Sequence, residues 1–224
     1  MTTSKKHIST FMLIFANLIP IFGVVFLQWD VKPIILLYWA ENVITGFYNI
    51  LRILFLKLEK PIYHIQKLFS ILFFSIHFGG FCGVHGFFLL SFFKLGGSES
   101  FFPETTWFAH LAFIQILYLV IKELFENMPP QMIWALSGLF ISHGISFVQN
   151  YIFGGEYKKL TIRKLMHRPY QRIAILHITI IFGGFFVFAV GSSLGILVML
   201  IGIKICVDIY LHNKSHKLNA KQGH

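Results

Sequence analysis

Long apolar runs recur along this chain and constrain its fold more than any other feature. An α-helix rises about 1.5 Å per residue, so about 20 apolar residues are enough to cross roughly 30 Å of hydrocarbon. Runs of this length lie at residues 8–29, 33–57, 68–93, 131–153, 171–190 and 193–212. The chain has 224 residues, of which 56% are hydrophobic and 12% charged, and no soluble fold of this size hides so much apolar surface. The sequence therefore predicts an all-α, polytopic transmembrane helix bundle that forms a single domain over residues 1–224.

One further apolar run, at residues 107–121, is too short to be an ordinary span. It has 15 residues, a length that suits an interfacial or re-entrant helix better. We therefore expect six spans plus one short helix, and a bundle of seven spans is the alternative.

The distribution of lysine and arginine predicts which loops face the cytoplasm. Basic clusters occur at Lys5 and Lys6, at Lys57, Lys60 and Lys67, at residues 158–172, and at Lys214, Lys217 and Lys221. Loops rich in cations face inward, so these clusters and both termini are expected on the cytoplasmic side. The connections at residues 30–32, 94–104 and 191–193 carry few cations and should face outward. The chain between residues 107 and 153 contains two apolar runs. The basic clusters can all face inward and the cation-poor connections all face outward only if one of these runs does not cross the membrane, which favours six spans.

Several classes of protein do not fit the sequence. The net charge is +10, but the cations lie in short loops beside apolar runs, so we expect attraction to anionic lipid and no nucleic-acid partner. Cys82 and Cys206 both lie inside apolar runs and suggest neither a disulfide nor a metal motif. No small-x-small cleavage site follows Lys5 and Lys6, so the first run is interpreted as an uncleaved span. We expect localisation in the cytoplasmic membrane of a bacterium or archaeon.

Polar residues inside the apolar runs are the candidates for function, because an ionisable group in hydrocarbon costs several kcal/mol unless it is paired. They are Glu41, Asn42, Asn49, Arg52, His77, His85, Ser142, His143, Asn150, His177, Lys204 and Asp208. Helical spacing places Asn42, Gly46 and Asn49 on one stripe and Glu41, Thr45, Tyr48 and Arg52 on the neighbouring stripe. The depth of each residue within its run puts Glu41, the histidines and Asp208 into one central layer.

This layer has the side chains that a zinc or iron ion needs, since imidazole nitrogens and carboxylate oxygens are common ligands of both metals. The candidate metal ligands are His77, His85, His143, His177 and Asp208, and the candidate catalytic residues are Glu41, Asn42 and Ser142. A metal-free polar network or proton relay and purely structural polar contacts remain alternatives. The sequence contains no GxSxG, HExxH, Walker or Rossmann motif.

Small residues at a spacing of four mark two places where a neighbouring helix could pack closely. Gly79 and Gly83 lie in one run, and Gly138, Ser142 and Ser146 lie in another. The glycines of the first run could either bend the helix or let a neighbouring helix pack close, whereas the second ladder implies a neighbouring helix, because small side chains let helix backbones approach. The second ladder would turn the polar face containing His143 toward the inside of the bundle.

The order of several motifs resembles an uncharacterised prokaryotic family, the domain of unknown function 6498. The motifs are Tyr38-Trp39 with Glu41-Asn42, His77 and His85, Ser142-His143-Gly144 with Asn150, Pro169-Tyr170-x-Arg172, Leu176-His177 with Gly183-Gly184, and Lys204 with Asp208. The resemblance covers nearly the whole chain and implies a multi-pass membrane protein, but it supplies no activity.

A looser similarity is to the intramembrane zinc hydrolases of the alkaline ceramidase and adiponectin receptor type. Those proteins set three histidines, an aspartate and a serine among seven helices, and the present chain contains the same residue types. They place two histidines close together on the last helix, whereas the last run here offers only Asp208 and His212. This analogy favours a hydrolase only slightly.

The leading hypothesis is an intramembrane, metal-dependent, hydrolase-like enzyme that acts on a lipid or another apolar small molecule. His77, His143, His177 and Asp208 would hold the metal, and Glu41 would be the general acid or base. The first alternative is a proton-coupled transporter or proton relay that uses Glu41, the histidines and the pair Lys204 and Asp208. The second alternative is a non-catalytic membrane scaffold.

Overall fold

The computed structural model describes residues 22–58, 62–93, 108, 111–128, 130–170, 173–175, 177–178, 198–199, 201–203 and 205. These residues are largely helical, and no strand occurs among them. The chain divides into two compact units, of which the first combines residues 1–34 with 177–224 and the second contains residues 35–176. The prediction of an all-α fold is confirmed for the described part of the chain.

The first unit is described mainly at residues 22–34. Residues 22–27 are helical, and the backbone N–H of Trp29 donates to the carbonyl of Gly23 at 3.0 Å. The carboxylate of Asp30 accepts a hydrogen bond from the N–H of Lys32 at 3.0 Å, where the next helix begins. Most of the predicted spans at 8–29, 171–190 and 193–212 lies outside the described residues.

The second unit contains most of the functional candidates, on four main helices. Helix α2 spans Val31–Phe55, α3 spans Ile62–Phe93, α4 spans Ala112–Asn127 and α5 spans Pro130–Ser146. A π-helix, η2 (Phe147–Phe153), continues α5, and the short 3₁₀ helix η3 (Glu156–Lys158) and helix α6 (Ile162–His167) follow.

Three helices in the described part of the chain are long and apolar enough to cross a membrane. They cover Val31–Phe55, Tyr63–Phe93 and Met132–Phe153. They correspond to the predicted runs at 33–57, 68–93 and 131–153, so these three predictions are confirmed by length and composition.

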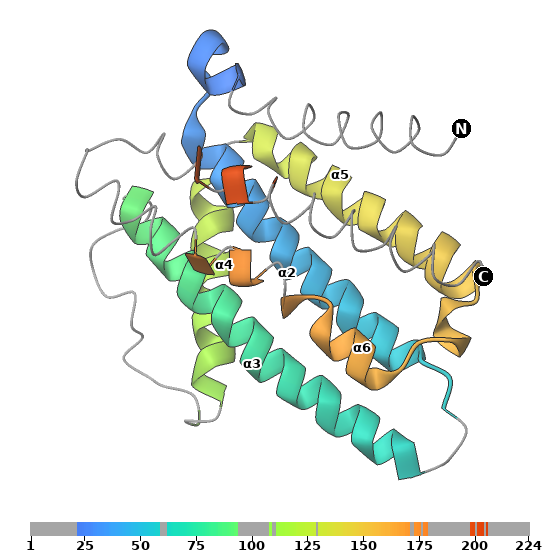
Figure 1. The fold of residues 1–224 in the computed structure, drawn as a ribbon. Helices are drawn as coiled ribbons and strands as arrows, with labels where there is room; N and C mark the ends of the chain where they lie inside the picture. Colours follow the sequence, from blue (N-terminus) through green and yellow to red (C-terminus); the bar gives the residue numbers. More distant parts are fainter. Residues whose placement is uncertain are drawn as a thin grey trace, which may run out of the picture. The chain divides into compact units, whose positions relative to one another are not determined.

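Helix α2 lies between α3 and α5 (Figure 1). The indole N–H of Trp39 donates to the carbonyl of Cys82 at 2.8 Å, and nearer its other end α2 contacts the beginning of α3, which therefore runs antiparallel to it. Helix α5 runs in the same direction as α2, because Tyr48 contacts Phe140 and the hydroxyl of Tyr151 donates to the carbonyl of Arg52. The hydrogen bonds of the Tyr48 and Tyr151 hydroxyls therefore join α2 to a parallel segment made of α5 and its continuation η2.

Helix α4 packs on the second half of α3 through glycines. A Cβ atom added at Gly80 would lie 2.9 Å from the Cβ of Phe113, and one added at Gly83 would lie 2.8 Å from the backbone nitrogen of Leu117. Residue numbers rise together along the two helices, so α4 follows α3 in the same direction from near its middle. Of the two interpretations of Gly79 and Gly83, a bend or close packing, the structure supports close packing.

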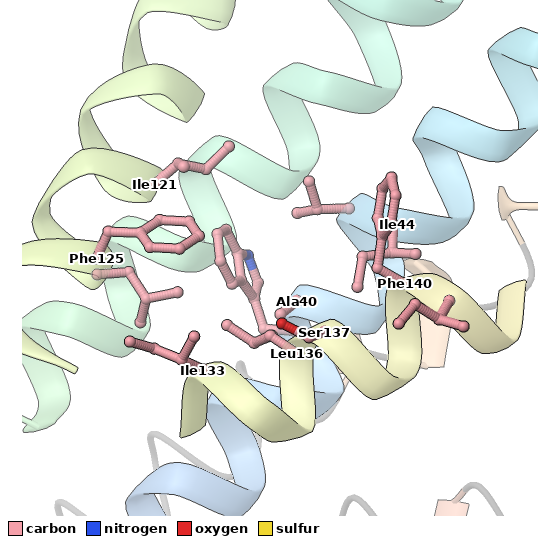
Figure 2. A pocket seen from close by; sticks show the side chains of 12 residues that line it. Ala40, Ile44, Ile121, Phe125, Ile133, Leu136, Ser137 and Phe140 are labelled. Atoms are coloured by element: carbon pink, nitrogen blue, oxygen red, sulfur yellow. The ribbon is translucent and has the colours of Figure 1, made fainter. Parts of the chain in front are cut away.

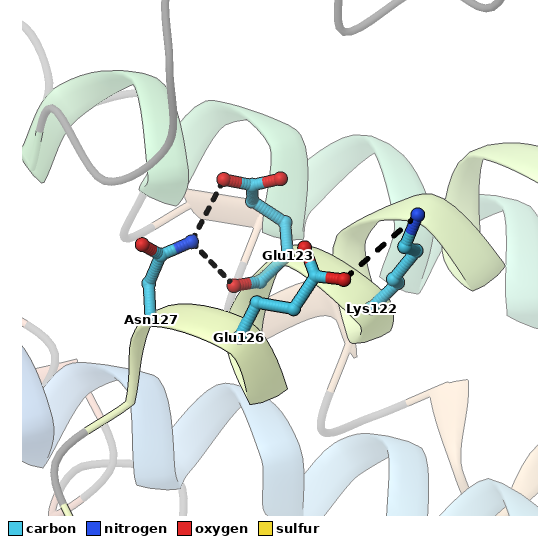
Figure 3. A network of polar contacts seen from close by, with 4 residues as sticks. All are labelled: Lys122, Glu123, Glu126 and Asn127. Carbon is cyan, nitrogen blue, oxygen red and sulfur yellow. Dashed lines mark hydrogen bonds and ion pairs between the residues drawn. The ribbon is translucent and has the colours of Figure 1, made fainter.

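The predicted boundaries of this short helix, 107–121, were wrong at both ends. The helix begins at Ala112 and continues to Asn127, through the charged residues that follow the apolar run. Figure 3 shows the reason: Lys122 approaches Glu126 at 3.8 Å, and the amide of Asn127 donates to the carbonyl and the carboxylate of Glu123 at 3.0 and 2.8 Å. These contacts between residues four apart stabilise the last turn.

Basic residues gather where α2 ends and α3 begins. The ammonium group of Lys67, which is buried, donates to the carbonyls of Leu54 and Leu56 at 2.9 and 2.8 Å and so caps the end of α2. Leu165 of α6 packs against Ile53 and Leu56 at the same place. Two of the predicted cytoplasmic clusters, at Lys57 to Lys67 and at residues 158–172, therefore meet at one end of the second unit.

Candidate functional site

Glu41 of α2 and His143 of α5 face each other across the contact between these helices. The Oε1 atom of Glu41 lies 3.7 Å from the Nε2 atom of His143, and their side chains are only 20% and 22% exposed. This separation is longer than a hydrogen bond but within the range of an ion pair. The two residues were predicted as candidates on different helices, and the structure brings them together.

Tyr48 fixes the position of His143. Its hydroxyl donates to the carbonyl of Phe140 at 3.0 Å, and its ring stacks on the imidazole of His143 with a centroid distance of 6.2 Å. A Cβ atom at Gly144 would lie 2.7 Å from this hydroxyl, so the approach depends on glycine. Tyr48 lies seven residues after Glu41 on the same stripe, a spacing that could have identified it as a site residue.

An apolar cavity of about 440 Å³ lies beside this pair, between α2, α4 and α5. It is lined by Trp39, Ala40, Val43, Ile44, Ile121, Leu124, Phe125, Ile133, Leu136, Ser137, Phe140 and Ile141. Figure 2 shows this arrangement, with labelled side chains from all three helices around one space. Neither Glu41 nor His143 is a lining residue, but Ala40 precedes Glu41 in the chain and Phe140 lies one helical turn before His143, so both members of the pair adjoin residues that line the cavity. Its volume is in the range of small-molecule sites.

Further buried polar atoms lie along α2, on the stripe of Glu41 and on the neighbouring stripe. Asn42 and Asn49 are only 5% and 2% exposed, and the amide of Asn42 donates to the carbonyl of Tyr38 at 2.7 Å. The Oδ1 of Asn42, the Nδ2 of Asn49 and the Oγ1 of Thr45 have no hydrogen-bond partner among the described residues. Unpaired buried polar groups are costly, so a functional explanation for these atoms is required.

The other predicted residues do not join the pair. The Nδ1 atom of His77 is hydrogen-bonded to the hydroxyl of Tyr170 at 2.8 Å, and its ring stacks on Phe73. Burial raises the pKa of the Tyr170 phenol, so this group keeps its proton at neutral pH. His85 is buried beside Phe81 on α3.

Of four further candidates, two form no site among the described residues and two lie outside them. Ser142 is exposed on α5, and no described atom lies within 4 Å of a Cβ added at Gly138, so the ladder at Gly138, Ser142 and Ser146 has no helix against it in the described part of the chain. His177 is an exposed residue of the other unit. Lys204 and Asp208 lie outside the described residues.

The predicted zinc or iron site stays a prediction, because Asp208, one of its ligands, lies outside the described residues. They contain no group of three histidine, cysteine, aspartate or glutamate side chains within reach of one metal ion. Glu41 and His143 supply two potential ligands, whereas a zinc site takes at least three from the protein. Both side chains are titratable, so the pair itself can exchange protons.

A family of unknown function, DUF6498, matches residues 1–224 of the chain. This confirms the resemblance carried by the sequence motifs. No curated protein and no solved structure matches the chain.

Proposed function

The chain belongs to the family DUF6498, whose function is unknown, and from its geometry we propose a multi-pass membrane protein that performs acid–base chemistry on a lipid or other apolar substrate. One observation carries this proposal: Glu41 and His143 form a partly buried pair, and the residues next to them, Ala40 and Phe140, line an apolar cavity of about 440 Å³. A catalytic acid or base next to a space for hydrocarbon is the arrangement that such an enzyme needs.

The proposed topology has six spans, at 8–29, 33–57, 68–93, 131–153, 171–190 and 193–212, with α4 as a re-entrant helix. The register of α4 supports this topology, because the helix starts beside Gly80 near the middle of α3 and leads toward the end of α3. Its 16 residues span about 24 Å, less than the roughly 30 Å of a hydrocarbon core. The charged residues of its last turn then lie near the outer surface.

Labelling of single cysteines with a membrane-impermeant maleimide tests this topology. Asn127→Cys, at the end of α4, is expected to react from outside intact cells, as is Ser98→Cys in the preceding connection. Arg163→Cys in the basic segment is expected to react only after permeabilisation, and Cys82, which is buried, should stay unreactive throughout. Reaction of Asn127→Cys from the inside alone would establish seven spans.

In the proposed reaction the Glu41–His143 pair moves a proton. One side chain takes a proton from water or from a substrate hydroxyl, and the other returns a proton to the leaving oxygen, as a hydrolase-like reaction requires. The cavity would hold the hydrocarbon part of the substrate and exclude water, which strengthens the electrostatic interactions of the pair. Tyr48 is a positioning residue, since it contacts the imidazole and the backbone of α5.

A proton relay is the second candidate, because one observation favours it. The unpaired polar atoms of Asn42, Thr45 and Asn49 continue along α2 from Glu41 toward the basic end. Ordered water between such groups conducts protons, and a relay needs no substrate in the cavity. Proton flux into pyranine-loaded proteoliposomes, abolished by Asn49→Leu, is the result that the relay predicts.

Filling the cavity tests the enzyme. The purified protein is reconstituted with a total lipid extract, and the lipids are followed by mass spectrometry. Ser137→Phe places a ring in the cavity and is expected to raise KM about tenfold, the effect of losing a well-packed apolar contact. Ala135→Phe, also exposed on α5 but not part of the lining, is the matched control and is expected to stay within about twofold of wild type.

The outcomes separate the three candidate functions. Lipid turnover that Ser137→Phe impairs and Ala135→Phe does not supports the enzyme. Proton flux without a change in any lipid contradicts the enzyme and favours the relay. Absence of both activities contradicts both and leaves the scaffold.

A further inference from the structure

Two arginines belong to segments that pack together at the basic end of the second unit, away from the acid–base pair. Arg52 is in the last turn of α2, and its backbone carbonyl accepts a hydrogen bond from the hydroxyl of Tyr151. Arg168 follows α6, and its Nη1 atom lies 3.9 Å from the Oε2 atom of Glu156 in η3. Three separate segments thus contribute these charged groups.

The positive charge of this group is not balanced. Glu156 lies 3.9 Å from Arg168, and Leu165 of α6 packs against Ile53, the residue that follows Arg52 in α2. One carboxylate therefore accompanies two guanidinium groups, which leaves a net charge of +1 before the neighbouring lysines are counted. Lys158, Lys159 and Lys164 are exposed on the same segment and carry further positive charge.

The side chain of Arg52 also has unused hydrogen-bonding capacity. Its Nε atom is buried and has no hydrogen-bond partner in the described part of the chain. Because a buried N–H of a charged group is costly to leave unpaired, an acceptor is expected at this position. The carboxylate of Glu156 forms an ion pair with Arg168, and at 3.9 Å the two groups are too far apart for a hydrogen bond.

We propose that Arg52 and Arg168 bind a phosphate group between α2 and the segment from η3 to α6. Guanidinium forks match phosphate oxygens, and an anion between the two arginines would balance their charge and supply the acceptor that Arg52 lacks. The phosphate comes either from the headgroup of an anionic lipid or from a free phosphate. The site lies about 16 Å along α2 from Glu41, so it does not depend on the proposed enzyme activity.

Thermal stability measured at increasing ligand concentrations tests this site, because a ligand that binds only the folded protein raises Tm. The full-length protein is purified without anionic lipid and titrated with dihexanoyl phosphatidylglycerol, inorganic phosphate or dihexanoyl phosphatidylcholine. We expect saturable stabilisation by phosphatidylglycerol or by phosphate and less by the zwitterionic phosphatidylcholine. A response to phosphatidylglycerol alone assigns the site to a headgroup, and an equal response to inorganic phosphate assigns it to free phosphate.

Matched variants localise the binding. Arg168→Gln is expected to weaken the apparent affinity about tenfold, the loss expected for one charge-assisted hydrogen-bonded contact. Arg163→Gln removes a cation of α6 outside the proposed clamp and is expected to stay within about twofold. Glu156→Gln removes the competing carboxylate and is expected to strengthen binding, an effect of opposite sign that loss of folding cannot mimic.

Two results would overturn the site. One is the absence of saturable stabilisation by any of the phosphate ligands. The other is an equal loss of affinity in Arg163→Gln and Arg168→Gln, which would indicate diffuse surface charge. Arg52→Lys keeps the charge of α2 but removes the planar fork, so it tests the role of Arg52 with less risk to folding, and unchanged affinity in this variant would exclude Arg52 from the site.

Discussion

Replacement of Glu41 with glutamine is expected to lower the rate of lipid conversion by the reconstituted protein at least about 100-fold, because removal of a general acid or base costs about this much. Glutamine has nearly the volume and polarity of glutamate but cannot take up or release a proton. The lipid turnover assay with mass spectrometry measures the rate. His143→Gln is expected to have a similar effect, since His143 is the other member of the pair.

Two comparisons show whether the pair acts as a unit. The double variant Glu41→Gln with His143→Gln is expected to be no slower than the worse single variant, because residues that share one step are not additive. His77→Gln removes a histidine that contacts Tyr170 instead of the pair, and it should keep turnover within about threefold. A loss with His77→Gln as large as that with Glu41→Gln would contradict the pair and favour a site where the histidines converge.

The sequence predicted the members of this site but not their pairing. Glu41 and His143 were identifiable because charged or titratable side chains rarely persist in apolar runs. Their contact depends on how α2 and α5 cross, which is set by Tyr48 reaching the backbone of α5 beside Gly144. The depth of each residue within its run placed the histidines in one layer. Depth does not say which way a side chain points around the helix axis, so it could not predict that His77 contacts Tyr170 instead of Glu41.

Small-residue spacing likewise allowed two packing contacts, and the described residues contain only one of them. Gly79 and Gly83 contact α4, whereas a side chain at Gly138 would meet open space among the described residues. Both segments have the same spacing of four, so the spacing shows that close approach is allowed but not that a partner exists. The end of α4 was missed for a similar reason, since Asn127 and Glu123 stabilise a charged turn that composition alone assigns to a loop.

The different surroundings of Gly83 and Gly138 predict a large difference in stability between their alanine variants. In Gly83→Ala the new methyl group would lie 2.8 Å from the backbone nitrogen and 3.1 Å from the Cα of Leu117. A backbone neighbour cannot rotate away, so α4 has to shift, and overpacking of this kind costs about 1 to 3 kcal/mol. Gly138→Ala is the matched control, because it makes the same chemical change in a helix where no described atom lies within 4 Å.

Both variants gain about 1 kcal/mol of helix propensity, so this gain cancels in their comparison. The free energy of unfolding is therefore expected to be about 1 to 3 kcal/mol lower in Gly83→Ala than in Gly138→Ala. Thermal unfolding of the purified variants in the same detergent provides the measurement. Since Ile121, Leu124 and Phe125 of α4 form one wall of the cavity, a displaced α4 should also slow lipid turnover, while Gly138→Ala should not. Equal stability of the two variants would mean that α4 does not pack on α3 at Gly83, and the half-length, re-entrant position proposed for α4 would lose its main support.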